Sequence, residues 1–259
     1  MSKSGSILGE SWGKLLTSIL QAYCSLNLWQ GGGSTFGVVV STTIKAFPSA
    51  PFYVFNVLIG TEPNTEAFWD AMTYWMSQYP SLADQGIAGY GTISPNTSYE
   101  GTYYGGFQGE FILPATSSAN TSESLAAPIT KMIDTITTLW PGLFVYENTS
   151  ATWPTFYDWW LPSNGPDYAG VDLLVGSRLL DAEALTGNLT ALKIALQGSI
   201  PPGPGQGGTV NFVSGKGVWN AVPRGGSDAV NPAWRSALLE YGTWQSSTYY
   251  VLRLQICRA

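Results

Sequence analysis

The feature that most constrains the fold is the alternation of strand-like runs, ended by glycine or proline, with long helical patterns. Runs rich in β-branched and aromatic residues predict strands, at Phe36–Phe47, Phe52–Ile59, Gly86–Ile93, Ser98–Tyr104, Phe107–Leu113, Leu143–Glu147, Val171–Leu180, Val210–Val213 and Tyr249–Ile256. Apolar residues at helical spacing predict helices, at Glu10–Cys24, Pro63–Tyr79, Ser122–Leu139, Asp181–Leu196 and Pro232–Tyr241. Strand pairs between long helices are typical of an α+β fold. We therefore expect an antiparallel sheet with helices packed on one face.

Local signals set the expected helix ends. Asp181 has a side chain that can act as the N-cap of the helix it begins. Pro80 is expected to end the helix at Pro63–Tyr79. Pro128 requires its helix either to start nearby or to kink. The chain has no repeat of fixed period and no strong linker, so we expect a single domain over residues 1–259, with 10–24 as an extra amphipathic helix.

The charge balance limits the partners. The chain has 11 Lys and Arg against 17 Asp and Glu, a formal net charge of −6. This acidic balance argues against a nucleic-acid partner, which requires a basic face. Hydrophobic residues reach 44% and charged residues only 11%, which indicates a folded chain and not a disordered one.

The complete absence of histidine removes several kinds of chemistry. Ser-His-Asp and Cys-His nucleophile systems are excluded, as are histidine-based metal sites. Acid–base work then falls to Asp, Glu, Tyr or Lys. We expect no metal site, and a catalytic style built on shape, stacking and hydrogen bonding.

The compartment is left open by the sequence. Cys24 and Cys257 lie in no CxxC motif, and two buried free thiols are favoured over a disulfide. No apolar run is long enough for a membrane span, and residues 1–10 lack a signal-peptide layout, so we expect a soluble protein with no membrane partner. Four N-glycosylation sequons nevertheless hint weakly at a secreted ancestry, at Asn96, Asn120, Asn148 and Asn188.

One string of residues resembles a known family. Leu28–Val39 reads LWQGGGSTFGVV and is followed by Thr42–Pro48. Together they resemble the FAD-linked oxidases of the berberine bridge enzyme-like group, at the junction between flavin domain and substrate domain. The segment Asp228–Arg235 resembles a later family segment. The resemblance covers about residues 25–259 and implies the α+β fold of the substrate domain.

The same resemblance shows what this chain lacks. In the family, an N-terminal domain holds the flavin pyrophosphate and the covalent attachment residues. The residues before Leu28 are too few to form it, no histidine can tether a flavin, and Cys24 lies in no recognisable attachment context. We therefore expect no cofactor and no cofactor-binding residues, with FAD as the alternative. The helix at Glu10–Cys24 would cover surface that a flavin domain otherwise buries.

The resemblance also selects candidate site residues, because in the family the sheet face opposite the helices lines the substrate cavity. Strand alternation then nominates polar side chains on that face. The catalytic candidates are Glu110, Gln108, Arg178, Tyr104 and Arg253. Glu110 is the candidate base, since family members use a sheet carboxylate in that role. The alternative is that these residues form a solvated sheet face carrying ion pairs, without a role in catalysis.

A second set is expected to bind the substrate. It combines further polar strand residues with the aromatic run after Ala151, and consists of Asp172, Trp153, Tyr157, Trp159, Trp160, Gln255 and Asn211. Core packing of the aromatic residues is the alternative to ligand stacking.

These features lead to three hypotheses. The first is a cofactor-independent, non-redox enzyme of natural-product biosynthesis, a cyclase or pericyclase of the Diels–Alder type, acting on a neutral organic substrate held in position for reaction. The alternatives are a residual FAD-dependent oxidoreductase and a non-catalytic small-molecule-binding protein. A homodimer is expected in each case, because a sheet face without its flavin domain would expose apolar surface.

Overall fold

The computed structural model describes seven segments, residues 5–7, 39–42, 48–99, 101–163, 173–213, 215–222 and 230–246. The chain divides into two compact units, Met1–Ser49 with Gly217–Arg235, and Ala50–Lys216 with Ser236–Ala259. The second unit contains the large sheet and every element of the site described below. The single domain over residues 1–259 stays a prediction.

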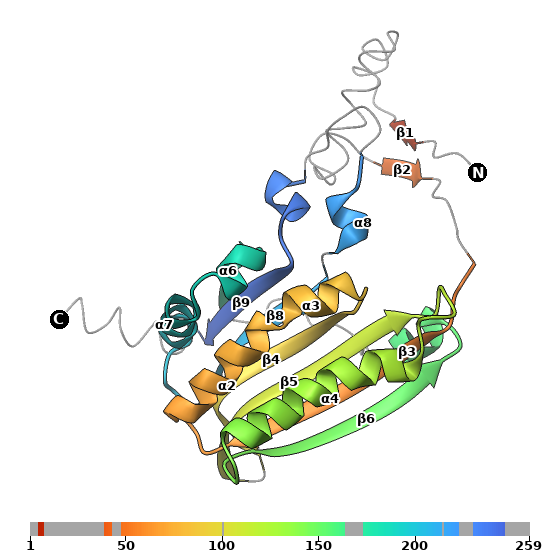
Figure 1. Cartoon of the computed structure of the whole chain (residues 1–259). Coiled ribbons are helices and arrows are strands. Elements are labelled where there is room, and N and C mark those ends of the chain that lie inside the picture. The colour runs from red at the N-terminus through yellow and green to blue at the C-terminus, as the bar shows by residue number, and fades with distance from the viewer. Residues whose placement is uncertain are drawn as a thin grey trace, which may run out of the picture. The chain divides into compact units, whose positions relative to one another are not determined.

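The second unit is built on a seven-stranded sheet (Figure 1). Its strands are β3 (Phe52–Thr61), β4 (Ala88–Tyr99), β5 (Thr102–Pro114), β6 (Val145–Trp153), β7 (Leu173–Leu180), β8 (Gln206–Phe212) and β9 (Leu239–Ser246). The strand order is β6-β3-β5-β4-β8-β9-β7, and each neighbouring pair is antiparallel. The predicted α+β class with an antiparallel sheet is confirmed.

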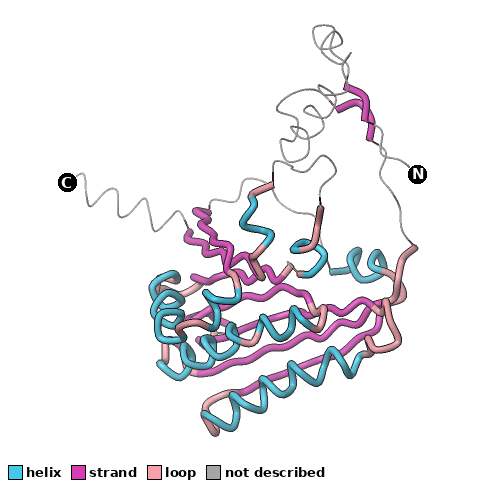
Figure 2. The backbone as a smooth tube through the Cα atoms, turned by 45° about the horizontal axis from the view of Figure 1, so that its top comes forward, coloured by secondary structure: helices cyan, strands magenta, loops and turns pink. Residues whose placement is uncertain are grey.

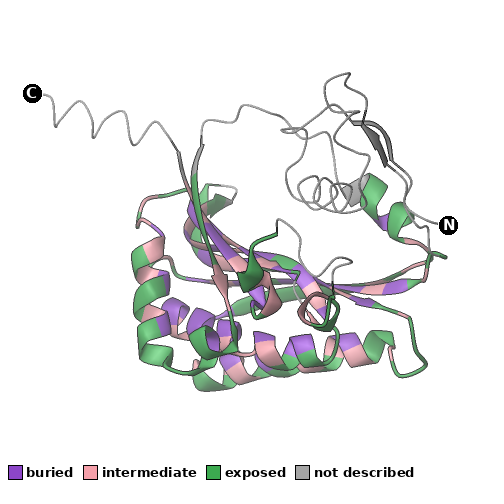
Figure 3. Ribbon diagram, turned by 90° about the horizontal axis from the view of Figure 1, so that it is seen from above, coloured by how far each residue is buried: buried purple, intermediate pink, exposed green. Residues whose placement is uncertain are grey.

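Helices cover one face of this sheet (Figures 1 and 3). They are α2 (Glu66–Ser77), α3 (Tyr79–Asp84) and α4 (Ser122–Leu139), with α6 (Ala182–Thr186) and α7 (Leu189–Ser199) packed beside α2. Figure 2 shows the strands and helices as separate layers. The exception is α5 (Phe156–Ser163), whose Trp159 packs on the other face, against Phe52 and Val54 of β3. None of the described helices is long and apolar enough to cross a membrane.

Aromatic side chains join the helices to the sheet. Trp75 of α2 is fully buried, with its ring centroid 4.9 Å from that of Phe107, and Tyr79 of α3 lies 4.7 Å from Phe212. Buried aromatic pairs of this kind contribute a large part of a core's stability. Gly109 makes room for the Phe107 ring, because a Cβ there would lie 2.6 Å from Phe107 Cε1.

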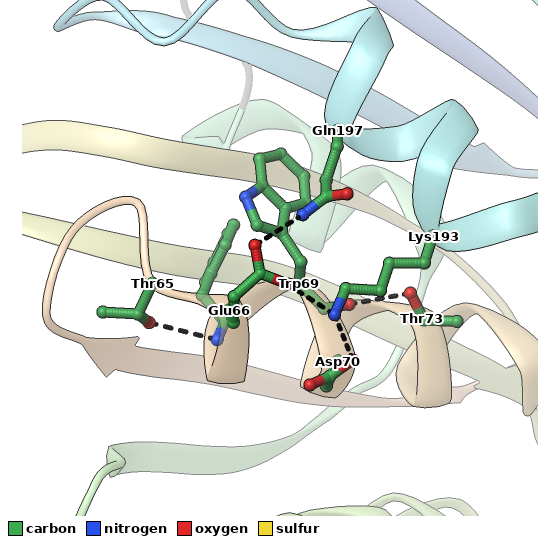
Figure 4. Close-up of polar contacts among 8 residues, drawn as sticks. Thr65, Glu66, Trp69, Asp70, Thr73, Lys193 and Gln197 are labelled. Carbon is green, nitrogen blue, oxygen red and sulfur yellow. Dashed lines mark hydrogen bonds and ion pairs between the residues drawn. The ribbon is translucent and has the colours of Figure 1, made fainter. Parts of the chain in front are cut away.

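An ion-pair cluster joins α7 to α2 (Figure 4). Lys193 Nζ lies 2.7 Å from Glu66 Oε2 and 2.6 Å from Asp70 Oδ1, and Gln197 Nε2 donates to Glu66 Oε1. The hydrogen bond from Lys193 lowers the pKa of Glu66, while Asp70 and Glu66 raise the pKa of Lys193. Exposed pairs contribute little to stability, so the cluster mainly sets the alignment of the two helices.

The first unit has little described structure. Strands β1 (Gly5–Ile7) and β2 (Val39–Thr42) form an antiparallel pair. Helix α8 (Lys216–Trp219) begins at the boundary between the units, and the 3-10 helix η1 spans Pro232–Arg235. Arg235 Nη1 donates to the carbonyl of Val218 at 3.0 Å.

Several predicted elements differ from the structure. Ser98–Tyr104 is not a strand but spans the β4–β5 turn, where Gly101 has a φ of 80° that a side chain would disfavour. Asp181 caps α6 as predicted, but a second helix, α7, then starts because Asn188 accepts from the amide of Ala191. Pro80 does not end the helical region, because it sits in the first turn of α3, where its missing N–H costs nothing.

The C-terminal part was predicted least well. Pro232–Tyr241 is helical only over η1, and its remainder enters β9, where pairing with β7 and β8 outweighs local helical spacing.

Pro128 lies inside α4, which starts earlier at a capping box on Thr121. The predicted helix 10–24, the strand Tyr249–Ile256 and both cysteines lie outside the described residues.

Candidate substrate-binding face

The sheet face opposite α2 and α4 carries a line of polar side chains. We call this face the open face, although α5 covers one part of it. The register of five strand pairs places one residue from each of six strands opposite its neighbour. This polar row runs Thr149, Asn56, Glu110, Tyr90, Asn211 and Glu240. Side chains at neighbouring strand positions lie close enough to act on one molecule.

Glu110 occupies the middle of the polar row, next to α5. Its Oε2 accepts a hydrogen bond of 3.2 Å from the indole nitrogen of Trp159. Burial raises the pKa of Glu110, and the hydrogen bond from Trp159 opposes that rise. A carboxylate with a raised pKa is a better proton acceptor than a free one, so Glu110 is the described open-face residue best suited to act as a base.

Glu240 has the opposite character. Asn211 Nδ2 donates to Glu240 Oε2 at 2.9 Å, and Ser177 also hydrogen-bonds this carboxylate. These bonds, that of Asn211 first, lower the pKa of Glu240. The open face therefore holds two carboxylates whose pKa values are shifted in opposite directions, which favours Glu110 over Glu240 as the proton acceptor.

A second row lies beside the first. Gln108 of β5 is exposed and pairs with Leu58 on one side and Thr92 on the other. Tyr104 follows the same alternation along β5 and is 37% exposed. The predicted shared face of Gln108 and Glu110 is confirmed, and Tyr104 and Asn211 lie on that face too.

The aromatic run divides into two groups. Trp159 is only 4% exposed, and Trp153 packs against the same cluster at the end of β6. Both therefore form core contacts, as the packing alternative requires. Tyr157 and Trp160 of α5 are exposed, and the Trp160 ring stacks on Phe156 with centroids 5.8 Å apart. The exposed pair leaves aromatic surface for a ligand.

The placement of Arg178 on the open face is wrong. In the β7–β9 register Arg178 lies opposite Tyr241, on the helix-covered side, where the Tyr241 hydroxyl contacts Ser199 of α7. Ser177, one residue earlier, faces the open side instead, because successive residues of a strand alternate. Asp172, Arg253 and Gln255 lie outside the described residues.

Several open-face residues are absent from the candidates predicted from the sequence, and three of them are large or charged. Tyr90 lies between Glu110 and Asn211 and is 47% exposed, while Glu240 and Trp244 come from β9. The Trp244 ring covers Gly207, where a Cβ would lie 2.6 Å from Trp244 Cζ2. The alternation of apolar and polar residues at Leu239, Glu240 and Tyr241 indicates a strand, but the helical spacing of Pro232–Tyr241 favoured a helix there.

The described residues do not match the charge of FAD. Their cations in the second unit are Lys131, Arg178, Lys193 and Lys216, none of which lies on the open face. Instead that face carries Glu110, Glu147 and Glu240. A dinucleotide diphosphate is held by cations or backbone amides, and the described strands of the open face offer it no cation. The described residues also form no acidic or cysteine cluster able to hold a metal.

Comparison of sequences finds relatives among fungal flavoproteins. The chain is 34% identical over 172 residues to the FAD-linked oxidoreductase apf9 of Gibberella fujikuroi, covering 63% of this chain and 28% of the relative. It is 30% identical over 228 residues to an uncharacterized FAD-linked oxidoreductase of Arthroderma benhamiae, covering 81% and 35%. The chain thus spans about a third of the length of these relatives. No family model matches it.

Solved structures share the fold. The VAO-type flavoprotein MtVAO713 of Myceliophthora thermophila C1 has a TM-score of 0.72 at 23% identity, covering 88% of this chain and 40% of that one. Physcomitrella patens BBE-like 1 has a TM-score of 0.55 at 13% identity, covering 86% and 46%. GilR, which catalyses the terminal step of gilvocarcin biosynthesis, has a TM-score of 0.56 at 12% identity, covering 98% and 53%.

The fold is therefore that of part of a VAO-type flavoprotein. In sequence the chain resembles part of the FAD-linked oxidoreductases, and in fold part of the berberine bridge enzyme-like proteins, the resemblance that its glycine-rich string predicts.

Proposed function

We propose that the open face binds a small organic molecule and that Glu110 moves a proton in a non-redox, ring-forming reaction on it. The protein would then be a cyclase or pericyclase of natural-product biosynthesis. The observation that carries the proposal is the half-buried Glu110 carboxylate, with its raised pKa, in the middle of an otherwise neutral stretch of the polar row.

The open face supplies orientation. Polar side chains run along its middle, while Phe156 and Trp160 of α5 leave exposed aromatic surface beside them. A substrate with one polar edge and one apolar ring system can contact both parts at once. Holding two reacting fragments in this way can contribute on the order of 7 kcal/mol or more to lowering a barrier.

The proton chemistry balances without a redox partner. Glu110 takes a proton from an acidic O–H or C–H group of the substrate, and the electron pair that remains forms the enolate or diene. The hydroxyl of Tyr90 or the amide of Gln108 donates to the substrate carbonyl and stabilises this charge. The ring closes, and the protonated Glu110 returns the proton to the product.

The natural-product part of the proposal is supported by GilR, whose fold is shared and which acts in gilvocarcin biosynthesis. The relatives favour a second candidate, because both are named FAD-linked oxidoreductases. In that case this chain would provide the substrate-binding part of such an enzyme, and the FAD would be held by residues outside those described.

The test uses the phenol precursor of an ortho-quinone methide, which must lose its O–H proton and a benzylic acetate, together leaving as acetic acid, before it reacts with an alkene partner. The rate of cycloadduct formation and the stereoisomer ratio of the cycloadducts are measured. We expect the wild-type protein to shift the ratio and Glu110→Gln to remove most of that shift. Glu147→Gln, which changes an exposed carboxylate on the edge strand β6, is the matched control. An unchanged ratio with wild-type protein would contradict a cyclase.

The flavin candidate has a separate readout. The purified protein is mixed with FAD, desalted and examined for flavin absorbance. Retained flavin that is bleached by a substrate would favour the oxidoreductase. A colourless protein that binds the cycloadduct without converting its precursor would favour the non-catalytic binding protein.

We further propose a symmetric homodimer, since the β6 edge of the open face exposes large apolar side chains outside the polar row, such as Leu58 and Val145. Light scattering is expected to give twice the chain mass, and a monomer would contradict this.

A further inference from the structure

The geometry points to Trp159 as the positioning residue of Glu110, fixing Oε2 so that Oε1 is the oxygen that exchanges the proton. The inference rests on the proposed role of Glu110 as a base. Trp159 Nε1 donates to Oε2 at 3.2 Å, and among the described residues no hydrogen bond to Oε1 is found. The two oxygens of one carboxylate thus have different environments.

The Trp159 ring is held firmly enough to impose this geometry. Its side chain is 4% exposed and meets the Phe52 ring edge to face, with centroids 5.7 Å apart, and the Phe156 ring at 5.1 Å. The start of α5 is fixed as well, because the Thr155 hydroxyl accepts from the Asp158 amide and donates to its carboxylate. A donor on a ring packed on two sides cannot follow a moving carboxylate, so the carboxylate is held in place instead.

The indole group also suits the chemistry of a base. An indole N–H only donates, so it bonds the ionised carboxylate and cannot compete for the substrate proton. It also opposes the rise in pKa that burial causes. Without this bond the carboxylate would be free to rotate, and Oε1 would no longer be held in one direction toward the proton that it takes.

Other ionisable groups near Glu110 do not duplicate this role. On the strands and helix around it, the titratable side chains of the open side are Tyr90, Tyr104, Glu147, Tyr157, Asp158 and Glu240. None of them is a cation, and the hydrogen bonds found among the described residues give none of them a contact with Glu110. Trp159 is therefore the described donor that sets the ionised form of Glu110.

The test is to follow the titration of Glu110 by NMR in protein labelled with carboxyl-13C glutamate, with Glu110→Gln used to assign its signal. Trp159→Phe keeps an aromatic ring but removes the N–H. We expect it to raise the pKa of Glu110 by roughly half to one pH unit, the scale of one lost charge-assisted hydrogen bond at a partly exposed site. Trp153→Phe, a tryptophan of the same cluster, is the matched control and should leave the titration unchanged.

A second measurement covers the case in which Trp159→Phe does not fold. In the wild-type protein the indole N–H signal of Trp159 should move with pH as Glu110 ionises, and Glu110→Gln should abolish that movement. The inference is overturned if Trp159→Phe leaves the Glu110 titration unchanged, or if the indole signal still moves in Glu110→Gln. Failure of the proposed function is separate, since it would appear as an unchanged cycloadduct ratio in Glu110→Gln.

Discussion

The two faces of the seven-stranded sheet differ in what they are built to contact. The helix-covered face buries Phe107, Phe111 and Phe212 against Trp75 and Tyr79. On the same strands, the open face carries Glu110, Tyr90 and Asn211 at the intervening positions. One set of strands thus serves stability with one half of its residues and recognition with the other.

This difference teaches where substitutions should act. A change on the helix-covered face removes packing and should lower stability. A change on the open face should leave stability nearly unchanged and alter binding or proton transfer.

Trp75→Ala should have the largest effect. The ring is fully buried between Phe107 and Phe111, so the change leaves a cavity that should cost about 3–5 kcal/mol of unfolding free energy. Tyr90→Ala, its counterpart on the open face, should cost less than about 1 kcal/mol. Urea unfolding measures the free energy of unfolding of both variants, and an equal decrease in the two would contradict the division between the faces.

Gly109→Ala tests how closely the Phe107 ring packs on the backbone at Gly109. A Cβ at Gly109 would come 2.6 Å from Phe107 Cε1, so the ring must shift, at a cost of about 1–3 kcal/mol. Gly176→Ala on β7 is the control, because a Cβ there meets nothing within 4 Å. Thermal melts of the two variants that coincide would show that the ring is not confined.

Glu110→Gln should slightly stabilise the protein at neutral pH. Because burial raises the pKa of Glu110, the folded state holds its proton more tightly than the unfolded state. The ionised side chain therefore costs stability above that pKa, by less than about 1 kcal/mol after solvent screening, and the cost disappears as the pH falls through it. Unfolding at neutral and acidic pH measures this, and a destabilised Glu110→Gln at neutral pH would contradict it.

Asn211→Ala should have the smallest effect and the opposite pH dependence. Asn211 and Ser177 lower the pKa of Glu240, so this carboxylate stabilises the fold above its ordinary value and loses that contribution as the pH falls through its folded-state pKa. Removing Asn211 should raise the pKa of Glu240, measurable by carboxyl-13C NMR, and reduce stability by a few tenths of a kcal/mol at neutral pH only. A Glu240 titration that does not move would contradict the hydrogen bond.

The faces of the central strands could be predicted from the sequence. Alternation along β5 separates Gln108 and Glu110 from Phe107 and Phe111, and a slip of one residue would move the aromatic residues to the other face. Thr121 and Asp181 likewise mark helix starts through side chains that cap the backbone locally.

The features that could not be predicted depend on contacts between segments that lie far apart in the sequence. Arg178 and Ser177 differ by one position, and only the register against β9 decides which of them faces the open side. Glu240 and Trp244 could not be predicted as open-face residues, because the apolar spacing of Pro232–Tyr241 indicates a helix. Pairing with β7 and β8 instead places the end of this segment in strand β9. The bond from Trp159 to Glu110 joins residues 49 positions apart and depends on where α5 packs.

The central claim is that the open face, and not the helix-covered one, receives the ligand. The direct measurement is an NMR titration of the labelled protein with the cycloadduct of the quinone-methide reaction. The account predicts shifts at the Trp159 indole and the Glu110 carboxyl, with the Trp75 indole signal unchanged. Saturable shifts confined to Trp75 and the other helix-face residues, or no saturable shift at any signal, would contradict it.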